Sequence, residues 1–148
     1  MQHLKRHGLC ISASVLFGFG LLYVLTGCCY PVDPDDEQPG IENPSFAQHI
    51  QPIFTASCAL SGCHNAGAAA GLDLSTGMSY AQLVGITSSQ DPSRERVDPG
   101  DAQASYLVVK IEGRQSEGSR MPLGRSPLSA TEIDTIRNWI NLGAEDNR

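Results

Sequence analysis

The feature that most constrains this chain is a pair of cysteines, Cys58 and Cys63, followed directly by His64. The chain has five cysteines, and only these two lie in the part that has the composition of a globular domain. That part has few large apolar side chains, so its core is thin. A disulfide or a bound cofactor is therefore expected to add stability. The fold therefore depends on what joins the two thiols.

The N-terminal segment indicates export. Lys5 and Arg6 precede an apolar run of 17 residues, Leu9–Leu25, which small residues follow. A charged region, an apolar region and small residues at a cleavage point form an export signal. The run is interrupted by two Ser and two Gly residues and falls short of a comfortable membrane span. Residues Leu25–Cys28, LTGC, resemble the lipobox of bacterial lipoproteins; an uncleaved anchor helix is the alternative.

We therefore predict a lipoprotein signal peptide over residues 1–27 and lipidation of Cys28, whose acyl chains hold the mature chain at a membrane surface. The rest of the chain is expected on the periplasmic side, outside the cytoplasmic membrane. Cys29, which is not Asp, favours the outer membrane. Residues 28–44 are rich in Pro and acidic residues and are predicted to form a solvated tether. Residues 45–148 then form a single domain.

The charge balance argues against nucleic acid as a partner. Cleavage before Cys28 removes Lys5 and Arg6 and leaves 121 residues, with 8 basic against 16 acidic side chains and a formal net charge of −8. Nucleic-acid binding relies on basic contacts to phosphates. A basic protein partner is favoured electrostatically instead.

The domain is predicted to be all-α, with about four helices and long loops. A first helix that begins near Ser45 places Phe46, Ile50 and Phe54 on one face. Pro52 lies inside this pattern and should kink the helix, because it has no N–H to donate. The helix then leads directly to the cysteine pair.

The last helix has the clearest local signature. Ser129–Glu132, SATE, is a capping box, and Gly143 is placed to end the helix. Shorter helices are predicted around residues 80–84 and over residues 105–113. The second of these also contains β-branched residues that favour a strand, but no other β-rich segment exists to pair with it.

The cysteine pair has two interpretations. Exported thiols rarely stay free, so Cys58 and Cys63 either form a disulfide, with His64 at the surface, or are both bound to a cofactor. A C-x-x-C-H run is typical of covalent c-type haem, in which each sulfur forms a thioether and the histidine is an axial ligand. Here the spacer has four residues, and Ser61–Gly62 supplies the flexibility for a bulge.

The loop Gly118–Gly124, GSRMPLG, offers a second axial ligand. Methionine in a core usually fills a gap on a helix or strand, whereas Met121 lies in a turn-like segment between Arg and Pro. Ligation by His and Met is a recognised haem c arrangement and raises the reduction potential. Met78 and His49 are the rival ligands, and an open sixth position is the remaining alternative.

The order of these motifs resembles a class I cytochrome c domain, and most closely the planctomycete type. The resemblance covers about Phe46 to Asp146 and rests on HIQPIFTASCALSGCH from His49, GLDLSTG from Gly71, VDPGDAQASYLVVKI from Val97, SRMP from Ser119 and LSATEIDTIRNWINLGA from Leu128. It implies that Cys58 and Cys63 are thioether positions. It also implies that His64 and Met121 are the proximal and distal ligands, and that the first and last helices pack together.

The sequence therefore predicts a lipid-anchored monohaem c-type cytochrome that carries single electrons between extracytoplasmic redox proteins. A catalytic role is not expected: His49 and His64 are the only histidines after the signal, and no acid–base or nucleophile constellation is visible. The alternative is a haem-free lipoprotein domain, stapled by a Cys58–Cys63 disulfide, that binds a protein or a surface polymer.

Overall fold

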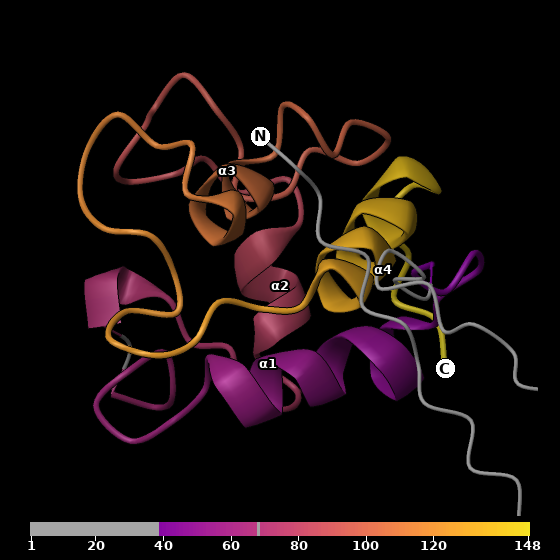
Figure 1. Ribbon diagram of the computed structural model, residues 1–148, viewed down its shortest axis with the longest axis horizontal. Helices are drawn as coiled ribbons and strands as arrows, with labels where there is room; N and C mark the ends of the chain where they lie inside the picture. Colours follow the sequence, from indigo (N-terminus) through magenta and orange to yellow (C-terminus); the bar gives the residue numbers. More distant parts are fainter. Residues whose placement is uncertain (1–38, 68) are drawn as a thin grey trace, which may run out of the picture. The chain divides into compact units, whose positions relative to one another are not determined.

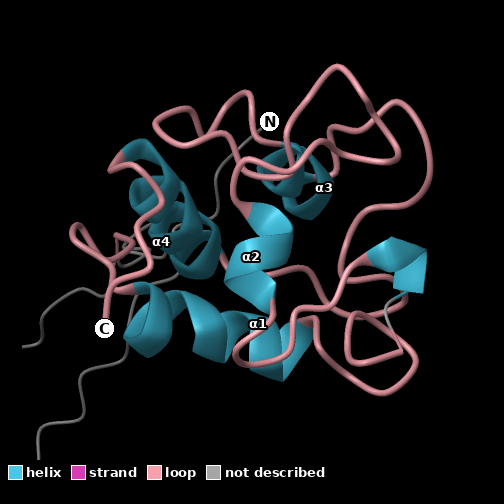
Figure 2. Cartoon of the chain, turned by 180° about the vertical axis from the view of Figure 1, so that it is seen from behind, coloured by secondary structure: helices cyan, strands magenta, loops and turns pink. Residues whose placement is uncertain are grey.

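The structure is a computed structural model that describes residues 39–67 and 69–148 (Figure 1). The predicted signal peptide, residues 1–27, and the lipidation site Cys28 lie outside the described residues, as does most of the tether. The helices are α1 Gln51–Ser57, α2 Ser79–Leu83, α3 Tyr106–Glu112 and α4 Ala130–Asn141. Long loops connect them, as Figure 2 shows.

The all-α prediction is confirmed, with four α-helices in the described part of the chain. Over those residues the only β-type pairing is a set of isolated bridges, such as Val84 with Val97. Helices α2 and α3 lie where the sequence predicted them, and α3 ends at Gly113, whose φ of +77° is the left-handed conformation that glycine favours. None of the described helices has both the length and the apolar content needed to cross a membrane.

The first helix has two parts that differ in hydrogen bonding. A π-helical segment, Phe46–Ile50 (η1), leads directly into α1. Ser45 caps its start, where the side-chain oxygen accepts a hydrogen bond from the N–H of Gln48. Pro52 lies in the first turn of α1, where a missing N–H is tolerated. The sequence predicted a kink at Pro52, and what the structure shows there is a change from π to α hydrogen bonding just before it.

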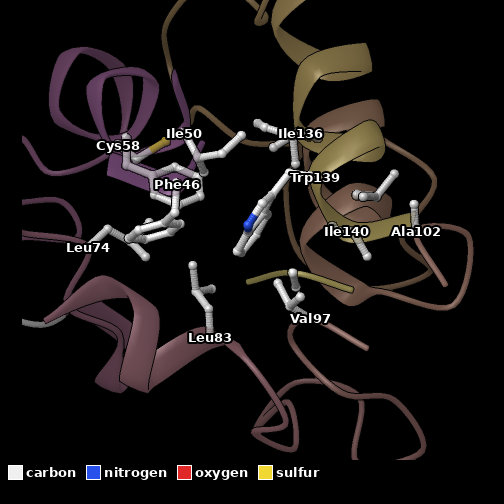
Figure 3. Close-up of a cluster of buried hydrophobic side chains, with 14 of the residues drawn as sticks. Phe46, Ile50, Cys58, Leu74, Leu83, Val97, Ala102, Ile136, Trp139 and Ile140 are labelled. Carbon is white, nitrogen blue, oxygen red and sulfur yellow. The ribbon is translucent and has the colours of Figure 1, made fainter. Parts of the chain in front are cut away.

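The core forms where the first and last helices meet. The ring centroid of Phe46 lies 5.2 Å from that of Trp139 and 5.3 Å from that of Tyr80. Trp139 is 1% exposed, and its indole N–H donates to the carbonyl of Glu145 at 2.9 Å. Figure 3 shows Phe46 and Trp139 among the aliphatic side chains of this core. The expected packing of the first helix on the last is confirmed.

The capping box predicted for α4 is present. The N–H of Ser129 donates to the Glu132 carboxylate at 2.8 Å, and the N–H of Glu132 donates to the Ser129 hydroxyl at 3.2 Å. Two N–H groups that the helix leaves unpaired are thus satisfied reciprocally. At the other end Gly143, with φ of +104°, ends the helix as predicted.

Replacing Ser129 by alanine is expected to lower the free energy of unfolding by about 1 kcal/mol, because the N–H of Glu132 loses its acceptor. Urea denaturation followed by circular dichroism measures the change. Ser116→Ala, at an exposed loop position, is the matched control and should leave the midpoint unchanged. Equal effects of the two substitutions would contradict a capping role.

Segments from both ends of the domain are fastened to its helices. A Cβ atom built on Gly40 would lie 2.5 Å from the backbone nitrogen of Thr135 in α4, so only glycine fits there. The carbonyl of Asn147 accepts a hydrogen bond from the Ser45 hydroxyl at 3.0 Å, and its side-chain oxygen accepts one from the N–H of Phe46 at 2.7 Å. Residues near the C-terminus therefore complete the cap of the first helix.

Candidate cofactor-binding site

One pocket gathers most of the side chains that the sequence singled out. Cys58, His64 and Met121 all line it, although they come from the end of α1, the loop after it and the loop that precedes α4. Most of the remaining wall is apolar. It includes Leu72, Leu74, Leu83, Leu107 and Ile111. The long connections of the domain are thus organised around a common apolar space.

His64 is held with one ring nitrogen free. Its Nδ1 lies 3.1 Å from the carbonyl oxygen of Ala69 and 3.3 Å from that of Leu72. Both partners are acceptors, so Nδ1 must carry the hydrogen, and Nε2 then has a lone pair available. A metal-ligating histidine typically donates its other N–H in this way, which fixes the tautomer and the ring orientation. The imidazole therefore has the bonding that an axial ligand requires.

The four-residue spacer forms a closed turn. The N–H of His64 donates to the carbonyl of Cys58 at 3.0 Å, and the N–H of Cys63 donates to the carbonyl of Leu60 at 2.9 Å. Gly62, with φ of +77°, has nothing within 4 Å of a Cβ built on it. The flexibility expected of Ser61–Gly62 is thus used as a left-handed turn that faces open space.

The two thiols have different surroundings. Both are free in this structure; Cys58 is buried, whereas Cys63 is half-buried in the turn. Cys58 contributes to the pocket wall, but Cys63 does not. Of the two predicted attachment positions, only Cys58 therefore faces the pocket directly.

Burial raises the pKa of the Cys58 thiol from 9.0 to about 11. In reduced, haem-free protein at pH 8, Cys58 should therefore react with iodoacetamide about 100-fold more slowly than a thiol of ordinary pKa, since only the thiolate is nucleophilic. Its rate should rise about tenfold for each pH unit between pH 8 and 10. Peptide mass spectrometry measures the rate of alkylation at Cys58 and at Cys63, and Cys63 should react first. Equal rates at the two cysteines would contradict the burial of Cys58.

The loop that carries Met121 is fastened to the end of α3. The N–H of Met121 donates to the carbonyl of Lys110 at 3.0 Å, and the Nε of Arg120 donates to the carbonyl of Ile111 at 2.9 Å. These carbonyls belong to the last turn of the helix, where they lack helical partners. Helix α3 thus fixes the position of Met121, whose side chain is half-buried at the pocket.

The two rival ligands do not line this pocket. Met78 is 48% exposed, at the residue before α2. The Nδ1 of His49 accepts a hydrogen bond from the N–H of Ser45 at 2.9 Å, so this ring is occupied in capping η1. Among the three candidates for the distal position, the structure brings only Met121 to the pocket with His64.

Two basic side chains in the wall were not predicted. Lys110 is buried with the apolar residues of α3, and no described residue forms a hydrogen bond with its Nζ. Arg96 donates to the carbonyls of Gln82 at 2.8 Å and Gly71 at 3.2 Å. No Asp or Glu from the described residues lines the pocket. The only sequence signal was a lysine inside an apolar run, which in an amphipathic helix usually lies on the exposed face.

The pocket is small as it stands, with a cavity volume of about 110 Å³. Pockets for drug-sized ligands span roughly 300–1,000 Å³. Several of the wall residues belong to loops, including His64, Ser88 and Met121. The donor set and the apolar lining suit a porphyrin in their chemistry, and a cavity that enclosed one would have to be larger than this.

Comparison of this chain with protein-family models, with curated proteins and with solved structures finds no match. Within the described residues, no three His, Cys, Asp or Glu side chains group so as to hold a metal ion. What the pocket does offer is one imidazole nitrogen, one thioether and one thiol at an apolar surface.

Proposed function

We propose that this protein is a lipid-anchored, extracytoplasmic monohaem c-type cytochrome that carries single electrons. The observation that carries the proposal is the presence, on one apolar pocket, of His64 with a free Nε2 and of Met121. Cys58 and Cys63 would hold haem c through thioethers, and His64 and Met121 would be its axial ligands. When bound, the haem supplies a reversible one-electron couple at its iron.

The chain's own residues would position the haem and tune its potential. The carbonyls of Ala69 and Leu72 orient the His64 ring. The thioether of Met121 and the apolar wall both favour the reduced state. The positive charges of Lys110 and Arg96 act in the same direction, since reduction lowers the charge at the iron.

The finer fold assignment, a class I cytochrome c domain, is part of the same proposal. Its support is the order of the helices, the packing of the first helix on the last and the docking of the methionine loop on α3. The predicted signal over residues 1–27 and the lipid on Cys28 would supply the anchor. The partners would be exported redox proteins with basic docking faces, which a mature formal charge of −8 favours.

A second candidate function is kept because Cys63 lies off the pocket wall and the spacer has four residues. This is a haem-free lipoprotein domain in which a disulfide joins Cys58 and Cys63 and which binds a protein or a surface polymer. In this case the pocket would be a minor feature of the core.

One experiment separates the two candidates. The exported protein is purified from cells that have the haem-attachment machinery, and its spectrum and its haem staining after denaturing electrophoresis are recorded. We expect a Soret band and a haem-staining species, both lost in the double variant Cys58→Ala, Cys63→Ala. A colourless wild-type protein with the two cysteines oxidised to each other would support the second candidate and exclude the cytochrome.

A further inference from the structure

Helix α3 buries a basic side chain for which the described residues supply no opposite charge. Lys110 is 7% exposed and lies beside buried Val109 and Ile111, and its Nζ has no hydrogen-bond partner. Withdrawing an ammonium group from water is costly unless an acceptor or an opposite charge compensates for it. None of the described residues supplies such a compensating group, and the pocket that Lys110 lines gives a ligand access to this side chain.

The groups around the ammonium cannot serve as its counter-ion. The ring centroid of Tyr106 lies 6.0 Å from Nζ. A Cβ built on Gly118 would lie 3.4 Å from Nζ and 3.5 Å from the Nε2 of Gln90, which is another donor. Asp91 and Glu117 act on the pKa of Tyr106 from a distance, but neither lines the pocket or bonds to Lys110. Burial lowers the pKa of Lys110, and no charged neighbour opposes this effect.

The pocket therefore selects a ligand with an apolar body and an acidic group. Its wall is mainly apolar, and its two charged side chains, Lys110 and Arg96, are both basic. The guanidinium of Arg96 already donates to the carbonyls of Gln82 and Gly71. Lys110 has all of its donors free, so it is the group best able to bind a carboxylate.

We propose that Lys110 binds a carboxylate of the pocket's ligand, which under the proposed function is a propionate of the haem. The inference rests on that function and adds to it the orientation of the ligand, whose acidic edge lies toward Lys110 on α3. Lys110 is thus a positioning residue for the haem and takes no part in its ligation.

The test uses full-length protein purified without haem from cells that lack the attachment machinery, with its thiols kept reduced. Haemin and haemin dimethyl ester, whose propionates are esterified, are titrated in turn, and the Soret absorbance gives the two dissociation constants. Wild type should bind haemin at least about tenfold more tightly than the diester, the effect of one buried charge-assisted hydrogen bond. Lys110→Met should reduce this preference by about tenfold, and Lys110→Arg should retain most of it.

Two controls make the result specific. Arg125→Met removes a positive charge from an exposed loop outside the pocket and should leave the preference unchanged. Circular dichroism checks that each variant keeps its helices. If both porphyrins bind but Lys110→Met leaves their ratio unchanged, the role of Lys110 is overturned and the cytochrome proposal stands. If neither porphyrin binds to wild type, this inference is overturned, and the proposed function is decided separately by the Soret band of the exported protein.

Discussion

Replacing Met121 by alanine in the haem-loaded protein is expected to remove the long-wavelength sulfur-to-iron band of the oxidised spectrum. The reduction potential should fall by on the order of 100 mV, because axial ligands shift haem potentials over a range of about 0.8 V. The backbone of the loop should stay in place, since the N–H of Met121 and the side chain of Arg120 still bond to the end of α3. The haem itself should remain attached through the cysteines.

Met78→Ala is the matched control for this substitution. Met78 also lies in a glycine-containing loop, but it is 48% exposed and does not line the pocket. Spectroelectrochemical titration of both variants should therefore show a lower reduction potential in Met121→Ala and an unchanged one in Met78→Ala. A band that persists in Met121→Ala and disappears in Met78→Ala would show that the distal ligand has been assigned to the wrong methionine.

Replacing Trp139 by alanine should lower the free energy of unfolding by about 3–5 kcal/mol, the usual cost of removing a large buried aromatic side chain. Trp139 is 1% exposed, packs against the rings of Phe46 and Tyr80, and donates to the carbonyl of Glu145. Its loss opens a cavity between the first and last helices. The free energy of unfolding of a small domain is only about 5–15 kcal/mol, so this substitution would remove a large part of it.

Leu142→Ala, at the end of the same helix, is the control for Trp139→Ala. Leu142 is 57% exposed, so its truncation should change the free energy of unfolding by less than about 1 kcal/mol. Urea titrations of wild type and both variants give the comparison. Similar midpoints for the two variants would contradict the central place of Trp139 in the core.

The helices were predictable where their signals are local. The capping box at Ser129 and the left-handed glycine after α3 act within one helical turn. The local sequence is therefore enough to determine where α4 begins and where α3 ends. The full cap of the first helix was not predictable, because Asn147, about a hundred residues away, accepts hydrogen bonds from Ser45 and Phe46. Local patterns do not contain such a contact.

The types of residue at the site were predictable, but which methionine reaches the pocket and which way Lys110 points were not. Met121 and Met78 both lie in glycine-containing loops, so composition hardly separates them. What separates them is the docking of one loop on the free carbonyls of α3, a tertiary contact. The inward position of Lys110 was missed for a related reason: the face that a lysine occupies depends on which side of the helix the rest of the chain covers.

The bonds from Asn147 to Ser45 and Phe46 also bear on the synthesis of the protein. The first helix obtains its hydrogen bonds to Asn147, and Phe46 obtains the indole it packs against, only once residues 139–147 have been synthesised. These contacts span nearly the whole domain, and contacts between residues far apart in the chain form slowly because the loop between them must first be closed. The closing of this core is therefore expected to be a late event in the formation of the protein.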